Sequence, residues 1–263
     1  MITIGIFGAT GRVGKLLIEE ILSHKKCQLA SVYVRNELQY NIPSSTLVTS
    51  DMSSFIESNE VIIDFSSPEA TQLLLESVLD SSADSQDIPA LVIGTTGLTP
   101  TQKKLLRKAS NKTPILYATN MSYGIAVLEK IVALLSRELR DFDIEIIETH
   151  HKYKKDSPSG TAHTLAESAL KARNLNEKYL KFNREGLALR KKDEIGMLSL
   201  RGGDVVGKHT VGFYGEGEYL ELTHNATSRV TFAKGALSAA LWLVDKKCGL
   251  YNMRDRFEIA HSE

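Results

Sequence analysis

A segment near the middle of the chain brings two imidazoles and three ammonium groups together within twelve residues, 150–161. A run of charge alone is usually a solvated surface. This run, however, leads into the predicted start of a helix at residues 159–161, where backbone N–H groups are suited to bind a carboxylate. Cations beside an anion-binding helix end predict a pocket for a small polyacid. The residues concerned are His150, His151, Lys152, Lys154, Lys155, Ser159, Gly160 and Thr161.

Two residues of this segment are candidates for a general acid. Repulsion from neighbouring lysines makes the proton of an imidazolium easier to lose, which suits an acid that works near neutral pH. We therefore expect His150 or Lys154 to deliver a proton. No metal site is expected here, because neighbouring strand residues such as His150 and His151 point to opposite faces and cannot readily bind one ion.

A glycine-rich stretch, residues 8–14, follows the first predicted strand and opens the first predicted helix. Glycines allow a tight turn and a close approach of the backbone to a pyrophosphate, whose charge the helix N-terminus stabilises. The glycines could also form a turn without a ligand, but the surrounding strand-helix-strand pattern favours dinucleotide binding. The expected cofactor contacts come from Gly8, Ala9, Thr10, Gly11, Arg12 and Val13.

The end of the second predicted strand bears on the choice between NAD and NADP. An acidic residue about 20 positions after the glycines would bind a ribose 2′-hydroxyl, but Val34 and Arg35 stand there. A guanidinium offers a fork of donors to a 2′-phosphate, so NADPH is somewhat favoured over NADH. The alternative is that Arg35 is an ordinary solvated cation and that Glu37, or no side chain, meets the ribose.

Two further turns follow predicted strands of the same half. Ligands of open α/β sheets bind beyond the carboxyl ends of the strands, so backbone groups of these turns are expected to hold the nicotinamide half of the cofactor. Taken alone, each of these segments could be an ordinary turn without a ligand. The residues are Gly94, Thr95 and Thr96 in the first turn, and Ala118, Thr119, Asn120 and Met121 in the second.

The elements that position these groups alternate between strand and helix up to residue 120. Such alternation, with strands apolar on both faces, predicts a parallel sheet covered by helices on both sides. The helix at Pro100 also carries a capping-box signal in Thr99 and Gln102. Strands are predicted over 2–7, 29–34, 61–65, 90–93 and 115–117, and helices over 11–24, 68–79 and 99–110.

After residue 120 the pattern changes to that of an α+β domain. A long amphipathic helix over 122–139 leads to an alternating strand over 143–149, and a helix follows over 161–172. Three segments, 197–200, 205–211 and 219–223, are predicted to form an antiparallel set before a final helix over 230–246.

Composition restricts the kind of protein. The 263 residues carry 32 basic and 32 acidic side chains, so no net field attracts nucleic acid or an anionic membrane. The longest apolar runs are far shorter than the roughly 18 to 20 residues that span a bilayer. Two distant cysteines without CxxC spacing argue against a disulfide scaffold, and we expect a cytoplasmic protein.

Other nucleotide-dependent classes fit less well. Short-chain dehydrogenases use Tyr and Lys four residues apart, and none of the nine tyrosines has Lys at that spacing. A sensor of NADP without catalysis would have no need of the segment 150–161. A semialdehyde dehydrogenase would need a nucleophilic cysteine, whereas Cys27 and Cys248 are expected to pack in interior elements.

Five segments together resemble the 4-hydroxy-tetrahydrodipicolinate reductase family, also called dihydrodipicolinate reductases. The histidine-containing segment is the most specific of them, and the glycine motif is the least specific. The segments span almost the whole chain: Gly8-Ala-Thr-Gly-Arg-Val-Gly14, Gly94-Thr-Thr-Gly97, Glu148-Thr-His-His-Lys-Tyr-Lys-Lys-Asp-Ser-Pro-Ser-Gly-Thr-Ala162, residues 201–209 and residues 228–237.

The resemblance implies reduction of a cyclic imine dicarboxylate by NADPH or NADH, in the route to diaminopimelate and lysine. Carried onto this chain, it makes His150 the acid/base residue and Lys154 a proton donor. His151, Gly160 and Thr161 would bind a substrate carboxylate. The segments around residues 8–13, 35, 94–96 and 118–121 would hold the cofactor.

The resemblance also implies an architecture. A Rossmann-like, doubly wound parallel sheet in residues 1–121 and 230–263 would bind the dinucleotide. A smaller α+β domain in residues 122–229 would bind substrate and build a homotetramer. Three positions depart from the commoner family pattern: Val34 replaces an acid, Ser157 an alanine and Lys208 a glutamate.

Overall fold

The computed structural model describes residues 1–35, 38, 40–81 and 88–257. Contacts between Cα atoms divide the chain into two compact units. Unit 1 comprises Met1–Ser122 and Arg229–Glu263, and unit 2 comprises Tyr123–Ser228. The domain boundaries expected from the sequence lie within one residue of these.

Unit 1 is built on a seven-stranded parallel sheet with the order β12-β6-β5-β4-β1-β2-β3. Every residue of β4 and β5 is buried, as expected for central strands that are covered on both faces. The strands are β1 (Ile2–Phe7), β2 (Cys27–Tyr33), β3 (Leu47–Thr49), β4 (Val61–Asp64), β5 (Ala90–Ile93), β6 (Pro114–Tyr117) and β12 (Gly249–Tyr251).

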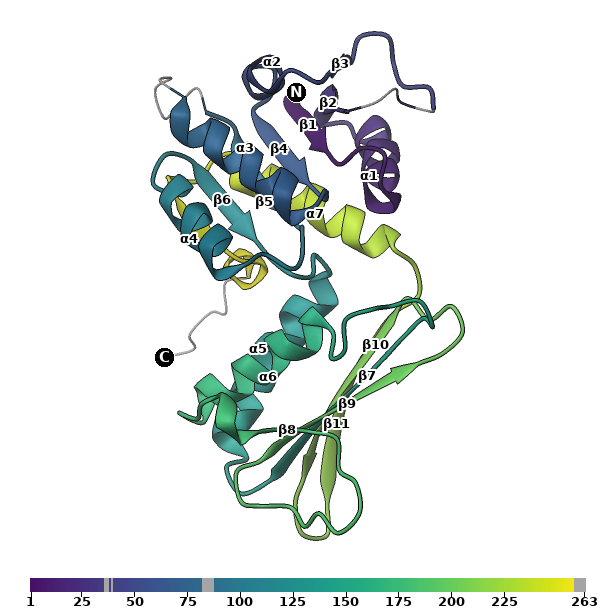
Figure 1. Ribbon diagram of the computed structural model, residues 1–263, viewed down its shortest axis with the longest axis vertical. Helices are drawn as coiled ribbons and strands as arrows, with labels where there is room; N and C mark the ends of the chain where they lie inside the picture. The colour runs from purple at the N-terminus through teal and green to yellow at the C-terminus, as the bar shows by residue number, and fades with distance from the viewer. Residues whose placement is uncertain (36–37, 39, 82–87, 258–263) are drawn as a thin grey trace. The chain divides into compact units, whose positions relative to one another are not determined.

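Helices cover both faces of this sheet (Figure 1). On one face, Phe55, Leu74 and Leu106 of α2, α3 and α4 share a core with strand residues. On the other, α1 and α7 contact each other, and α7 crosses β4, β5 and β6. The predicted doubly wound fold is confirmed. The helices are α1 (Arg12–Ser23), α2 (Met52–Glu57), α3 (Pro68–Asp80), α4 (Pro100–Ala109), α7 (Val230–Leu243) and the 3₁₀ helix η2 (Met253–Arg256).

Unit 2 packs two helices on one face of a five-stranded sheet with the order β11-β10-β7-β9-β8. Side chains of β7 alternate in burial, and Ile144 and Ile146 face the core under the helices α5 and α6. The elements are α5 (Tyr123–Glu138), β7 (Asp143–His150), α6 (Gly160–Ala172), the 3₁₀ helix η1 (Glu177–Tyr179), β8 (Leu180–Phe182), β9 (Ile195–Arg201), β10 (Gly207–Tyr214) and β11 (Tyr219–Ala226).

The antiparallel set expected in unit 2 is only partly correct. Strands β10 and β11 do pair antiparallel, but β7 lies between β10 and β9, and β9 runs parallel to β7. Strands that are neighbours in sequence often pair, but here β7 takes the central position, and its apolar residues Ile144 and Ile146 share a core with residues of both helices. The short elements β3, α2, β8 and β12 carry too little periodicity to be predicted from the sequence.

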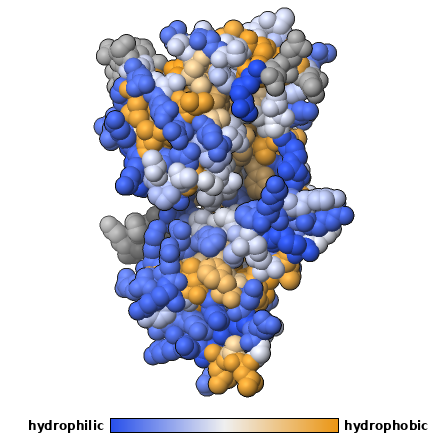
Figure 2. Space-filling view, in the orientation of Figure 1, coloured by the Kyte–Doolittle hydropathy of each residue, from blue (hydrophilic) through white to orange (hydrophobic). Residues whose placement is uncertain are grey.

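The expectation that Cys248 packs in an interior element is wrong. Cys27 is buried in β2 as predicted, but Cys248 is exposed in the turn before β12, because the last helix ends at Leu243 rather than at residue 246. In the part of the chain that the structure describes, no helix has the length and apolar character needed to cross a membrane. On the visible face of each unit, hydrophilic side chains predominate and hydrophobic areas lie between them (Figure 2).

Candidate active site

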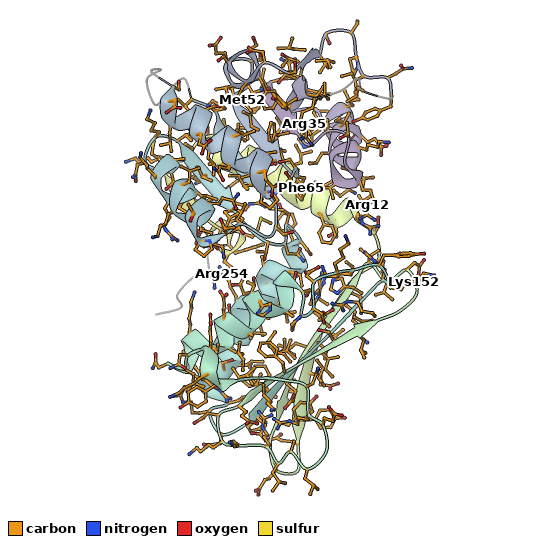
Figure 3. The ribbon with its side chains drawn as sticks, in the orientation of Figure 1. Arg12, Arg35, Met52, Phe65, Lys152 and Arg254 are labelled. Atoms are coloured by element: carbon orange, nitrogen blue, oxygen red, sulfur yellow. The ribbon has the colours of Figure 1, made fainter. Side chains whose placement is uncertain are left out.

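The glycine turn of unit 1 lies at the carboxyl end of the central strand β1. Gly8 has a φ of +94°, and a Cβ there would lie 2.6 Å from the carbonyl oxygen of Phe65, at the end of neighbouring β4. A Cβ on Gly14 would overlap the carbonyl oxygen of Gly8, so both positions require glycine. Arg12 and Phe65 lie at this edge of the sheet (Figure 3). The edge includes the topological switch point between β1 and β4, from which the chain adds β2 and β3 on one side of β1 and the later strands on the other.

The N-terminus of α1 is suited to an anion. Its N-cap, Gly11, makes no capping hydrogen bond through a side chain, and the first turn holds no acidic residue, within the described part of the chain. By contrast, α2, α3, α4 and α6 are each capped by a side chain. The uncapped N–H groups and the helix dipole together favour a phosphate group.

Two arginines of unit 1 bring positive charge to this region. Arg12 stands in the first turn of α1, and Arg229 is the N-cap of α7. Burial, with the nearby charge of Arg12, lowers the pKa of Arg229. An anion between two guanidinium groups would relieve their repulsion. No local pattern in the sequence indicates a role for Arg229, because its proximity to Arg12 depends on the return of the last helix to unit 1.

The position of Tyr40 beside the glycine turn was also not predicted from the sequence. Its hydroxyl donates a 2.7 Å hydrogen bond to the carbonyl oxygen of Ala9, and the ammonium of Lys15 lies 5.1 Å from the centre of its ring. Val34 is buried, and Arg35 is exposed directly after it. Glu37, the alternative ribose contact, lies outside the described residues.

A buried carboxylate, Asp64, organises the loops after β4 and β5. Its Oδ1 accepts hydrogen bonds from the backbone N–H of Ser66 at 2.8 Å and from the hydroxyl of Thr95 at 3.1 Å, and Thr71 donates to its Oδ2. Burial raises the pKa of Asp64, although these donors oppose the shift. The Thr95 hydroxyl therefore serves the loop itself, and the backbone N–H of Gly94 donates to the carbonyl oxygen of Asp64 at 2.9 Å, so a cofactor would have to meet other backbone groups of residues 94–96.

The turn after β6 is positioned by the sheet and by α7. The N–H of Ala118 donates to the carbonyl oxygen of Ile93, and Asn120 accepts a 2.8 Å hydrogen bond from the N–H of Ser122. Met121 has an exposed fraction of only 1%. Its side chain belongs to the core, and its carbonyl oxygen packs against Gly235 of α7. The structure thus brings the segments at 8–13, 94–96 and 118–121 to one edge of the sheet.

Unit 2 holds the histidine cluster. His150 ends β7 on the same face as the apolar residues Ile144 and Ile146, and it is 8% exposed. Its Nδ1 lies 2.5 Å from Oε2 of Glu148, two residues earlier on the same face. Arg201, the register partner of His150 on β9, binds both oxygens of Glu148. Alternation along a strand explains why Glu148 and His150 meet.

A second imidazole packs against His150. The ring centroids of His150 and His209 are 5.1 Å apart with the planes nearly perpendicular. Nε2 of His209 lies 3.1 Å from Oγ of Ser159, the N-cap of α6, which in turn accepts a hydrogen bond from the N–H of Ala162. Burial, with the nearby charge of His150, lowers the pKa of His209 to about 3, so the ring is neutral at pH 7.

The lysines of the loop are not equivalent. Lys154 is partly buried, and its ammonium lies 2.8 Å from Oδ1 of Asp156. Lys152, labelled in Figure 3, and Lys155 are exposed. The ammonium of Lys152 lies 5.1 Å from the centre of the Tyr153 ring. Gly160 and Thr161 open α6, as predicted, and His151 follows β7 directly. Among the described residues no cluster of side chains is suited to hold a metal ion.

A parallel sheet with a glycine turn at its switch point, joined to an α+β unit with a histidine cluster, defines a Rossmann-type pyridine-nucleotide oxidoreductase. Comparison with known proteins specifies the family. Residues 2–121 match the family model "Dihydrodipicolinate reductase, N-terminus" and residues 124–257 match "Dihydrodipicolinate reductase, C-terminus". The chain belongs to the dihydrodipicolinate reductase family, and the resemblance found in the sequence is confirmed.

Curated relatives support this assignment. The 4-hydroxy-tetrahydrodipicolinate reductase of Helicobacter hepaticus is 61% identical over 261 residues, which cover 98% of this chain and 100% of the relative. The corresponding enzyme of Wolinella succinogenes is 54% identical over 258 residues, which cover 97% and 99%.

Solved structures agree in fold. A dipicolinate-bound dihydrodipicolinate reductase from Paenisporosarcina sp. TG-14 has a TM-score of 0.78 at 24% identity, with coverage of 98% of this chain and 100% of that chain. A diaminopimelate dehydrogenase from C. glutamicum has a TM-score of 0.56 at 12% identity, with coverage of 97% and 93%.

Proposed function

We propose that this chain reduces 4-hydroxy-tetrahydrodipicolinate to tetrahydrodipicolinate with NADPH or NADH, in the route to diaminopimelate and lysine. The observation that carries the proposal is the buried Glu148–His150 pair, at a distance of 2.5 Å, beside the cationic loop and the start of α6. The names of the relatives at 61% and 54% identity support the choice of substrate.

The residues of unit 1 fit a dinucleotide. Gly8 and Gly14 leave no room for a side chain where the backbone would approach the pyrophosphate, and α1 begins without a side-chain cap. Arg12 and Arg229 add positive charge at this edge. Bound there, a reduced nicotinamide would supply a hydride.

The residues of unit 2 would bind the dicarboxylate and move a proton. The N–H groups of Gly160 and Thr161 at the helix start, with His151, would bind a carboxylate. His150 would be the acid/base residue, acting through Nε2, and Lys154 would be a proton donor. His209 stays neutral, so it adds no repulsion to a protonated His150.

The proposal also includes the preference for one nucleotide and the location of the protein. Arg35, exposed beside the buried Val34, would favour the 2′-phosphate of NADPH. Both cysteines are free thiols, which suits a cytoplasmic enzyme.

We propose a homotetramer built through the outer face of the sheet in unit 2. Leu198 and Leu200, which point away from the core residue Met197 along β9, are 37% and 55% exposed. Sedimentation should give a tetramer for the wild type and smaller species for Leu198→Lys/Leu200→Lys, and a monomeric wild type would contradict the assembly.

A direct assay tests the activity. Oxidation of NADPH and NADH would be followed with freshly generated 4-hydroxy-tetrahydrodipicolinate, for the wild type, His150→Gln and Lys154→Ala. His150→Gln should lower kcat by about 100-fold or more, the size expected for a general acid. Lys171→Ala, which alters an exposed lysine in the last turn of α6, is the control and should retain wild-type turnover. No turnover in the wild type, or full turnover in His150→Gln, would contradict the proposal.

A further inference from the structure

We infer that Glu148, held in place by Arg201, is the positioning residue of the site: it binds the Nδ1 side of His150 and so reserves Nε2 for proton transfer. The inference rests on the proposed function for the task of His150. The arrangement of Glu148, Arg201 and His150 itself lies within unit 2.

Burial makes the contact between Glu148 and His150 consequential. Glu148 has an exposed fraction of 0% and lies on the core face of β7. A carboxylate without water must find ionic or hydrogen-bonding partners within the protein, because an unpaired buried charge is strongly destabilising. Nδ1 of His150 at 2.5 Å from Oε2 is one such partner.

Arg201 supplies the compensating charge. Its Nη1 donates to Oε2 of Glu148 at 2.9 Å and its Nη2 donates to Oε1 at 2.8 Å. This two-point contact fixes the plane of the carboxylate. Although burial opposes it, hydrogen bonds from His150 and Arg201 hold the pKa of Glu148 well below its ordinary value. Glu148 therefore remains an acceptor at any pH at which the enzyme would work.

The same carboxylate is connected to the proposed carboxylate site. Oε1 of Glu148 accepts a 3.1 Å hydrogen bond from the backbone N–H of Ser159, the N-cap of α6. Nη2 of Arg201 also donates to the carbonyl oxygen of Asp156 at 2.6 Å. Glu148 and Arg201 thus orient the ring of His150 and the start of α6 together.

The consequence for His150 is a fixed division between its two ring nitrogens. A carboxylate that only accepts keeps a proton on Nδ1, so the proton that moves is the one on Nε2. When the Nε2–H bond of the imidazolium breaks, its electron pair stays on the ring, and a neutral imidazole protonated at Nδ1 remains. Nε2 is directed toward Gly207, where a Cβ would lie 3.0 Å away, so a larger residue there would crowd the reactive atom.

Glu148 could instead serve only to tie β7 to β9 through its ion pair with Arg201. Substitution of Glu148 would then lower the stability of the protein but would not change the tautomer of His150. The tautomer is therefore the distinguishing observable, and it can be measured in the wild type without any substitution.

The experiment uses the full chain labelled with ¹⁵N-histidine, in which long-range ¹H–¹⁵N correlations report which ring nitrogen is protonated. His150→Gln identifies the resonances of His150. When neutral, His150 should carry its proton on Nδ1 in the wild type, and in Glu148→Gln the Nε2–H tautomer should become populated. Nε2–H as the major neutral tautomer in the wild type, or an unchanged tautomer in folded Glu148→Gln, would overturn the inference.

Steady-state kinetics of the same variants provide a second test of the inference. Glu148→Gln should lower kcat by about 10- to 100-fold, as for other carboxylates that orient a functional histidine, while KM for the nucleotide stays within about threefold of the wild type. Glu145→Gln is the matched control, because Glu145 also lies on β7 and also pairs with an arginine, Arg190, but it stands on the other face. It should retain wild-type kcat and the wild-type tautomer. An unchanged kcat in Glu148→Gln would overturn the inference, whereas an inactive wild type with the Nδ1–H tautomer would refute only the proposed function.

Discussion

Gly235, in the middle of α7, packs directly against the carbonyl oxygen of Met121, the last residue of the turn after β6. A Cβ at this position would overlap that oxygen. The contact joins two segments more than 100 residues apart and places a helix of the returning chain against a turn that is proposed to hold the nicotinamide.

Replacing Gly235 with alanine should therefore destabilise the protein, although alanine normally favours a helix by about 1 kcal/mol over glycine. We expect a loss of about 1 to 3 kcal/mol in the free energy of unfolding, the usual effect of overpacking, and a higher KM for NAD(P)H. Urea denaturation and steady-state kinetics measure both. Lys234→Ala, at an exposed position of the same helix, is the control and should change stability by less than about 0.5 kcal/mol.

Asp64→Ala should weaken unit 1 at its cofactor edge. The substitution leaves the buried hydroxyls of Thr71 and Thr95 without this acceptor, whereas the N–H of Ser66 keeps its second acceptor, the hydroxyl of Thr95. We expect a loss of about 2 to 4 kcal/mol, since each unsatisfied buried donor costs about 1 to 3 kcal/mol and hydroxyls can partly reorient. Asp80→Ala, at the exposed end of α3, serves as comparison in the same denaturation experiment. Equal stability of the two variants would contradict the role of Asp64.

Arg173→Ala should destabilise unit 2. The Arg173 side chain, 3% exposed, donates hydrogen bonds to the carbonyl oxygens of Ser136, Leu139 and Phe142, which follow the end of α5 or lie in its last turn. Its removal takes a donor from all three acceptors, of which the Leu139 carbonyl oxygen keeps the N–H of Phe142, and we expect a loss of about 2 to 4 kcal/mol in the free energy of unfolding. Arg137→Ala, an exposed arginine in the last turn of α5, should cost less than about 1 kcal/mol.

Burial of His209 should make the stability of the protein depend on pH. In the unfolded chain this histidine takes up a proton near its ordinary pKa of 6.5, whereas burial and the charge of His150 lower its pKa in the folded protein to about 3. Between these values the unfolded state binds one more proton, so stability falls as the pH decreases from about 6.5 to 3.

Denaturation of His209→Gln across this pH range measures the effect. The dependence of the unfolding free energy on pH should become shallower than in the wild type by up to about 1.4 kcal/mol per pH unit. Identical slopes for the two proteins would show that His209 is protonated in the folded state, contrary to the neutral ring described above.

Arg35→Ala tests the proposed preference for NADPH. Loss of the guanidinium should raise KM for NADPH by about tenfold, as for the loss of a charge-assisted hydrogen bond worth about 1.5 kcal/mol, and should leave KM for NADH within about twofold. Lys25→Ala, at an exposed cation after α1, is the control for a general change in charge. Equal increases for both nucleotides would indicate that Arg35 does not meet the 2′-phosphate.

Much of the fold follows from local patterns in the sequence. The strands β1, β4 and β5 are short apolar runs, and α4 carries its capping box in Thr99 and Gln102, which the structure confirms. The glycine turn was recognisable because strand, glycines and helix follow one another directly. These features depend on residues close in the sequence, so the sequence is sufficient to predict them.

Other features depend on contacts between distant segments. Packing decides the pairing of β7 with β9 instead of β9 with β10, the exposure of Cys248, and the electrostatic effect of Arg12 on Arg229. A weak hint of the Glu148–His150 pair did exist, since residues two apart on a strand share a face. Its partner Arg201, however, is 53 residues from Glu148 and could not be inferred.

The sequence by itself thus determined which chemical groups are present and which local elements carry them: the glycine turn, the histidines and lysines of the 150–161 segment, and the start of α6. Only the tertiary structure decided which of these groups are buried together, and therefore that Glu148 ionises beside His150 while His209 stays neutral. The reason is physical: periodicity and capping act over a few residues, whereas burial and electrostatic pairing depend on neighbours that the sheet register brings from far along the chain.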